Sequence, residues 1–353
     1  MLDEILAQAV AKQASDIFLI AGLPVSYKCS GVIRREDAPP LKPADTAQLA
    51  AQLYERAGRT EEALLNTGDD DFSFAVPHLS RFRVNALRQR GSLGLVIRVV
   101  PFTLPDFRQC HIPDSVMAFA QFTRGLVLIT GAAGSGKSTT LACIIDAINS
   151  TRNCHIITLE DPIEFLHSHK KSVVTQRELS IDTANYDVAF RAALREAPDI
   201  ILLGEMRDPE AIRAAVTAAE SGHLVISTLH TIGAANTIDR IIDVFPSAQQ
   251  QQIRTQLALV LEGVASQQLI TAEDGSLMPA FEVMTATPAI RNMIRESKAH
   301  QLDTVIASSA AAGMSTMDQS LLALVRSGRV SKHAALSHAV NPDWLEKRLA
   351  AQL

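Results

Sequence analysis

The stretch that decides the fold of this chain is Gly125-Leu126-Val127-Leu128-Ile129-Thr130, followed at once by Gly131-Ala132-Ala133-Gly134-Ser135-Gly136-Lys137-Ser138. The first six residues are mostly apolar and β-branched, which is typical of a strand buried on both faces of a parallel sheet. The next eight match Gly-x-x-x-x-Gly-Lys-Ser, the phosphate-binding loop (P-loop) pattern, and they directly follow that strand, as the pattern requires. The sequence therefore predicts an α/β domain that binds a nucleoside triphosphate.

Each residue type in this loop has a physical reason. Glycines allow positive φ and let backbone N–H groups approach phosphates closely. A helix expected to begin near Gly136 adds the positive end of its dipole. We expect Lys137 to bring a positive charge to the β- and γ-phosphates of ATP, and the Ser138 hydroxyl to bind Mg²⁺. The candidate ATP-binding residues of this segment are Gly131, Ala132, Ala133, Gly134, Ser135, Gly136, Lys137, Ser138 and Thr139.

Length and composition indicate an ordinary globular protein. The chain has 353 residues, of which 47% are hydrophobic and 20% charged, and this length allows about two domains. A net charge of −5 argues against a chain that coats nucleic acid. The four cysteines form no Cys-x-x-Cys pair, so neither a zinc site nor a disulfide framework is expected. An acidic start and the lack of a long apolar run predict a cytoplasmic protein.

The chain divides by pattern into two regions. Residues 1–100 predict a smaller α/β unit, residues 101–115 are rich in proline and predict a linker, and residues 116–353 predict the nucleotide-binding domain. In the first region we expect a helix at 43–57 and strands at 16–20, 72–76, 81–85 and 93–100. In the second we expect further buried strands at 155–159, 200–203 and 224–228. From about residue 233 to the end the pattern favours helices.

Hydrolysis needs a carboxylate that can orient water toward the γ-phosphate, and two segments offer one. Residues 160–164 place three carboxylates after a buried strand, although a solvated acidic turn is the alternative interpretation. The apolar strand 200–203 ends in Gly204-Glu205, which is the Walker B arrangement with glycine where an acid is usual. Glu205 is therefore the one carboxylate at that strand end, and its contact with a metal is expected to be weak or water-mediated.

Two histidines, His223 and His230, bracket the expected strand 224–228. A single histidine at a strand end is usually structural, but two beside the Walker B unit favour a role near the nucleotide. Metal ligation is not expected, because no cysteine or second carboxylate lies at ligand spacing.

The order of these motifs resembles the secretion ATPases, which drive type II secretion and type IV pilus machines. The resemblance covers nearly the whole chain and rests on the P-loop, Glu160-Asp161-Pro162-Ile163-Glu164, Gly204-Glu205-Met206-Arg207-Asp208 and the histidine box over residues 222–231. Residues 289–296, Ala-Ile-Arg-Asn-Met-Ile-Arg-Glu, resemble a motif of the pilus-retraction members. Taken alone, that segment reads as an amphipathic surface helix.

The resemblance implies an architecture and an assembly. These are a PAS-like N-terminal α/β domain, a RecA-like P-loop ATPase domain and a homohexamer, with ATP between the two domains and close to the neighbouring subunit. It implies ATP and Mg²⁺ as cofactors, with Glu164 as the catalytic base and Glu205 assisting at the metal. Arg83 and Arg98 stand where the family places arginines that sense the γ-phosphate, although each alone would read as a solvated strand charge.

The implied function is a motor that hydrolyses ATP to power pilus retraction and twitching motility. It would work at the cytoplasmic face of the inner membrane through a platform protein (PilC-like), and an accessory retraction ATPase (PilU-like) is a further expected partner. The alternatives are an accessory or extension motor, an ATP-binding regulatory subunit without turnover, and a DNA-translocating motor. Intact Lys137, Glu164 and Glu205 argue against the second, and the lack of aromatic–basic clusters argues against the third.

The chain departs from the family pattern at a few positions. Ala132-Ala133 replaces Pro-Thr in the P-loop, Phe18 stands where histidine is common, and Ala197 stands where an acid is usual. Pro209 replaces a leucine, yet proline after an Asp208 N-cap favours a helix start. None of these changes removes a candidate catalytic group.

Overall fold

The computed structural model describes residues 1–29, 31–100 and 104–351. They form two compact units, Met1–Thr103 with Glu164–Leu166, and Leu104–Ile163 with His167–Leu353. Part of the expected linker, residues 101–103, lies outside the described residues.

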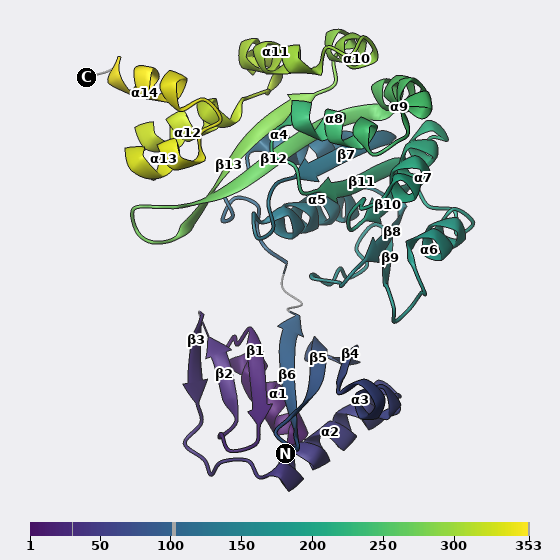
Figure 1. Ribbon diagram of the computed structural model, residues 1–353, viewed down its shortest axis with the longest axis vertical. Coiled ribbons are helices and arrows are strands. Elements are labelled where there is room, and N and C mark those ends of the chain that lie inside the picture. The colour runs from purple at the N-terminus through teal and green to yellow at the C-terminus, as the bar shows by residue number, and fades with distance from the viewer. Residues whose placement is uncertain (30, 101–103, 352–353) are drawn as a thin grey trace. The chain divides into compact units, whose positions relative to one another are not determined.

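The first unit contains an antiparallel six-stranded sheet in the order β3-β2-β1-β6-β5-β4 (Figure 1). Its four expected strands are confirmed, with ends that differ by a few residues. The strands are β1 Asp16–Ile20, β2 Ser26–Cys29, β3 Val32–Arg35, β4 Asp69–Val76, β5 Ser80–Gln89 and β6 Ser92–Val100. The helices are α1 Leu2–Ala11, α2 Pro43–Ala57 and α3 Glu62–Thr67, and α2 has the predicted bounds.

Burial alternates along β5, which shows that the helices cover one face of this sheet. Phe82 and Val84 are fully buried and share a core with Leu49 of α2, whereas the residues between them are partly exposed. Because side chains alternate between the faces of a strand, Arg83 lies on the opposite face. It pairs in register with Arg98 of β6.

The second unit contains a seven-stranded sheet in the order β13-β12-β7-β11-β10-β8-β9. All neighbours are parallel except β12 and β13. The strands are β7 Gly125–Thr130, β8 His155–Glu160, β9 Val173–Glu178, β10 Ile200–Leu203, β11 Leu224–Leu229, β12 Leu261–Thr271 and β13 Leu277–Thr285. The four strands predicted in this region are confirmed.

Helices cover both faces of this sheet (Figure 1). On β7, Leu126 and Leu128 enter one core, while Val127 and Ile129 enter another that includes α5. The α-helices are α4 Asp114–Met117, α5 Lys137–Thr151, α6 Tyr186–Ala193, α7 Pro209–Glu220, α8 Ala234–Asp243, α9 Ser247–Val260, α10 Pro288–Arg295, α11 Leu302–Ser308, α12 Met317–Arg326, α13 Lys332–His338 and α14 Pro342–Ala350. Short 3₁₀ turns are η1 Ala118–Gln121, η2 Ala299–Gln301 and η3 Ala310–Ala312.

The expectation of helices from residue 233 onward is wrong for one segment. Strands β12 and β13 pair antiparallel from Gly263 opposite Thr285 to Thr271 opposite Leu277. Both strands are largely buried, so they lack the alternation that identifies a strand with one exposed face. None of the helices in the described parts of the chain combines the length and apolar character needed to cross a bilayer.

Candidate functional site

The P-loop joins β7 to α5 and has the backbone form that its glycines allow. Gly131, Gly134 and Gly136 have φ values of 143°, 76° and 87°, which other residues rarely adopt. A Cβ at Gly131 would lie 2.2 Å from the backbone oxygen of Gln267 on β12. The loop therefore needs glycine both for its conformation and for its contact with the neighbouring strand.

Lys137 begins α5 and lies folded over the loop. Its Nζ donates to the backbone oxygens of Gly131 and Ala132, each at 2.8 Å, and its side chain is buried. Ser138 and Thr139 follow in the first turn and are partly exposed. The Oγ of Ser135 is buried without a hydrogen-bond partner among the described residues. Donors thus gather where a helix N-terminus already favours an anion.

Parallel pairing brings the other candidate groups to the edge where the P-loop lies. Thr130 at the end of β7 pairs with Leu229 of β11, and β10 and β8 lie next in order. The residues after these strands therefore share the carboxyl edge of the sheet. They include His230, Glu205 and Asp161.

Glu205 is the centre of an ionic network at this edge. One of its oxygens contacts the Arg207 guanidinium, and the other lies 3.1 Å from Nε2 of His230. Arg207 also lies 3.9 Å from Asp161. Burial raises the pKa of Glu205, but Arg207 and His230 outweigh burial, so its pKa lies below the ordinary value. The side chain is 16% exposed and is held as a carboxylate.

Close packing accounts for the glycine where the Walker B pattern usually has an acid. A Cβ at Gly204 would lie 3.1 Å from the Tyr186 hydroxyl and 3.3 Å from the Leu159 oxygen. Burial raises the pKa of Tyr186 to about 12, so the phenol is neutral at physiological pH. A longer side chain at residue 204 would displace it.

The second acidic segment follows β8. Glu160 accepts hydrogen bonds from Thr158 at 2.6 Å and Gln176 at 3.3 Å, so it is held within the sheet. Glu164 has an exposed side chain. Asp161 is exposed as well, but it lies 3.9 Å from Arg207 in the Glu205 network, so exposure alone does not choose between the two carboxylates.

His223 lies at the other end of β11 from these groups. Its Nδ1 lies 3.1 Å from the Ala218 oxygen and from Ser221 Oγ, at the end of α7. Because β11 separates it from His230, the two lie about 23 Å apart at ~3.3 Å per residue. Within the chain, the structure brings His230 but not His223 to the carboxyl edge.

The two candidate arginines lie together on the first unit. Arg83 and Arg98 are register partners on β5 and β6 and line a shallow pocket of about 220 Å³ with Asp16 and Asp71. Arg98 Nε donates to Asp16 at 3.0 Å, yet its side chain remains 64% exposed. The face of this sheet away from its core therefore carries two adjacent guanidinium groups.

Sequence reasoning missed two residues of the site. Arg207 lies within the motif 204–208, and its spacing of two residues from Glu205 is the signal that identifies it. Gln267 packs against the P-loop, and its Oε1 accepts from Thr140 of α5 at 2.7 Å. No local signal in the sequence indicates Gln267, because the pattern from residue 233 onward favours helices.

Helix α10 carries the segment that resembles the retraction motif. Ile290 and Ile294 are fully buried in the core. The Arg291 guanidinium donates hydrogen bonds to the backbone oxygens of Ala258 and Leu259 and to the Glu262 carboxylate. The apolar stripe therefore anchors the helix, and Asn292 and Arg295 are on its exposed side.

The residues present fit a magnesium ion bound together with a nucleotide. No cluster of three or more His, Cys, Asp or Glu residues that could hold a metal occurs in the described parts of the chain. Mg²⁺ at P-loops takes most of its ligands from phosphates and water, so the half-exposed Ser138 hydroxyl is an adequate protein ligand. Both Glu205 oxygens already have partners, which favours contact through water.

Comparison with known proteins gives a consistent family. The model of the family described as "Type II/IV secretion system protein" matches residues 1–314. The chain is 45% identical to "Type IV pilus retractation ATPase PilT" of Pseudomonas aeruginosa, over 97% of this chain and 99% of that protein. It is 48% identical to "Twitching motility protein" of Neisseria gonorrhoeae, over 77% of this chain and 73% of that protein.

A solved structure extends the similarity to three dimensions. A crystal structure of the pilus retraction motor PilT with bound ADP matches with a TM-score of 0.90 and 43% identity, over 98% of this chain and 99% of that one. The chain belongs to the type II/IV secretion system protein family, and it is an ATPase.

Proposed function

We propose that this chain is the ATPase motor that powers retraction of a type IV pilus, and with it twitching motility. The observation that carries the proposal is similarity to a retraction ATPase over nearly the full length of both proteins. The site supports it, because the P-loop, Glu205 and His230 meet at one sheet edge.

In the proposed reaction, Lys137 leaves the Gly131 and Ala132 oxygens and binds the β- and γ-phosphates. Ser138 would hold Mg²⁺, which supplies positive charge to the phosphates when it is bound. Glu164 would accept a proton from the attacking water, which is the role that the family resemblance implies for it, and its exposed side chain can reach water. Glu205 keeps its charge through Arg207 and His230, and it orients water at the phosphate end.

The two units would act as the domains expected from the sequence, 1–100 and 116–353, joined by residues 101–115. Arg83 and Arg98 are proposed to sense the γ-phosphate. Two adjacent guanidinium groups repel one another, and a bound anion would relieve that repulsion. Asp16 and Asp71 line the same pocket and offset part of it.

The assembly is proposed to be a homohexamer at the cytoplasmic face of the inner membrane. It would act on the pilus through a platform protein there (PilC-like). This location follows from the function proposed, since the machine that it serves spans the membrane.

Deletion of the gene tests the proposal. We expect hyperpiliated cells that do not twitch, restored by wild-type protein but not by Lys137→Ala, since that change removes the phosphate-binding cation. Purified Lys137→Ala should lose at least ~100-fold in phosphate release, a loss of the size seen when one key electrostatic group is removed. Bald cells would instead identify an extension motor.

An accessory retraction ATPase is the second candidate. The chain is 36% identical to "Type IV pilus ATPase PilU" of Pseudomonas aeruginosa, over 96% of this chain and 88% of that protein. An accessory motor would leave retraction largely intact in the deletion strain, so the same experiment separates the two.

A further inference from the structure

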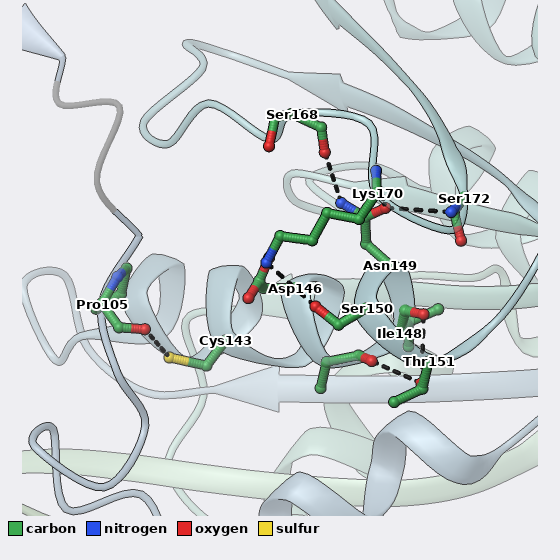
Figure 2. Close-up of polar contacts among 11 residues, drawn as sticks. Pro105, Cys143, Asp146, Ile148, Asn149, Ser150, Thr151, Ser168, Lys170 and Ser172 are labelled. Carbon is green, nitrogen blue, oxygen red and sulfur yellow. Dashed lines mark hydrogen bonds and ion pairs between the residues drawn. The ribbon is translucent and has the colours of Figure 1, made fainter.

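A buried asparagine ties the P-loop helix to the segment that follows Glu164. Asn149 lies near the C-terminal end of α5 and is 0% exposed. Its Nδ2 donates to the Ser168 oxygen at 2.7 Å, and its Oδ1 accepts from the Lys170 and Ser172 N–H groups at 3.1 and 3.3 Å (Figure 2). One side chain therefore makes three hydrogen bonds, all to the backbone of residues 168–172.

The helix end itself adds to this clamp. The backbone oxygen of Asn149 accepts from the Lys171 N–H at 2.9 Å, and it is one of the last four helix carbonyls, which lack partners within the helix. Ser172 Oγ donates to the Arg152 oxygen at 2.7 Å. Residues 168–172 therefore cap α5 as well as being held by it.

Lys170 makes a different kind of contact with the same helix. Its Nζ reaches Asp146 at 2.6 Å and Ser150 at 3.1 Å along the surface (Figure 2). Its side chain is 40% exposed, so this ion pair contributes little to stability. It offers a matched control within the same segment.

The loop that carries Glu164 is anchored on both sides. The Ile163 N–H donates to Glu178 at 3.3 Å, and the His167 N–H donates to Gln176 at 2.7 Å. Both acceptors are on β9, which begins directly after the clamped residues. Only residues 164–166 lie between the anchors, and a chain spans at most about 3.5 Å per residue. The two ends of the segment that carries Glu164 are therefore held by β9, and β9 directly follows the clamped residues 168–172.

We propose that Asn149 is a positioning residue that sets Glu164 relative to the phosphates. Lys137 and Asn149 are twelve residues apart on α5, or about 18 Å along one rigid helix. Because α5 is one continuous helix, a displacement of its first turn by bound phosphate would be carried to the clamp and the loop. This inference rests on the proposed role of Glu164 as the base.

The test uses the full-length assembled protein and compares Asn149→Ala, Asn149→Asp and Lys170→Ala in ATP hydrolysis. Asn149→Ala should lower kcat about tenfold and leave the KM for ATP within about twofold. Asn149→Asp keeps the two accepted hydrogen bonds but turns a buried carboxylate oxygen toward the Ser168 oxygen, so we expect a loss at least as large as that of Asn149→Ala. Lys170→Ala should stay within about twofold of wild type.

A double mutant separates positioning from a general structural defect. In single turnovers, Asn149→Ala should cause no further loss when Glu164 is already glutamine. An equal loss in both backgrounds, or wild-type kcat in Asn149→Ala, overturns the proposal. If Glu164→Gln alone keeps wild-type kcat, the base assignment has failed, which is a distinct result.

Hydrogen exchange covers the case in which Asn149→Ala does not fold. In Asn149→Asp, amides of residues 163–172 should exchange at least threefold faster than in wild type, while those of the P-loop stay unchanged. Unchanged exchange at residues 163–172 together with wild-type kcat would contradict the proposal.

Discussion

Histidine has different partners at the two edges of the seven-stranded sheet. At the carboxyl end of β11, His230 joins Glu205 and Arg207 in an ionic network beside the P-loop strand. At the amino end, His223 bonds the Ala218 oxygen and Ser221 at the end of α7. The same residue type therefore meets a carboxylate at one end of β11 and a helix carbonyl at the other.

The difference has a simple physical origin. Parallel strands all end at one edge, and helices such as α5 and α7 begin there, so their N-terminal dipoles favour anions at that edge. At the other edge helices end, and their unpaired carbonyls need donors. His223 meets such a carbonyl, whereas His230 meets a carboxylate.

Replacing Glu164 with Gln should give the largest effect at the carboxyl edge. Loss of a general base lowers rates by roughly 10²–10⁴, so we expect kcat to fall at least ~100-fold. Nucleotide affinity should change by less than about threefold, because Lys137 and the loop backbone are intact. Phosphate release and titration with a fluorescent nucleotide measure the two quantities.

A carboxylate of the amino edge is the control for that result. Glu220 lies at the end of α7 and accepts from Gln256 at 2.9 Å, so Glu220→Gln should keep wild-type kcat. If Glu164→Gln and Glu220→Gln hydrolyse ATP at the same rate, Glu164 is not the base.

The histidine pair gives a smaller effect and tests the comparison directly. His230→Ala removes a hydrogen bond to a charged group, an interaction of about 1.5–3 kcal/mol, and should lower kcat about tenfold or more. His223→Ala should leave kcat within about twofold, because its partner is a helix carbonyl. Equal losses in the two variants would show that the two ends of β11 are not distinct in function.

Sequence alone predicted most of the second unit's sheet and the P-loop, because buried parallel strands and glycine spacing are local signals. The expected strands at 200–203 and 125–130 match β10 and β7. Strands β12 and β13 were missed, since burial on both faces removes the alternation that separates strand from helix. Their pairing depends on the whole sheet, so no local pattern carries it.

The site was predictable where one motif contains both partners, and less so where partners are distant. Lys137 and Ser138 follow from the loop pattern. The contact of Gln267 with Thr140 joins residues 127 positions apart, and spacing cannot reveal it. The separation of His223 from His230 was, by contrast, available from the sequence, because a strand places its flanking residues at opposite edges of a sheet.

The smallest expected effect concerns how the carboxyl edge holds Glu205 charged. Its pKa is below the ordinary 4.5 in the folded protein, so its charge stabilises the fold above about pH 4.5, and this contribution is lost as pH falls through the folded pKa. Glu205→Gln should lower Tm at pH 7 by about 2–4 °C, the shift that 1 kcal/mol gives in a domain of this size. The difference from wild type should shrink as pH falls below 4.5. A Tm difference that stayed constant from pH 7 to pH 3 would mean that Arg207 and His230 do not stabilise the carboxylate. The contrast between the two ends of the sheet would then rest on hydrogen-bond geometry alone.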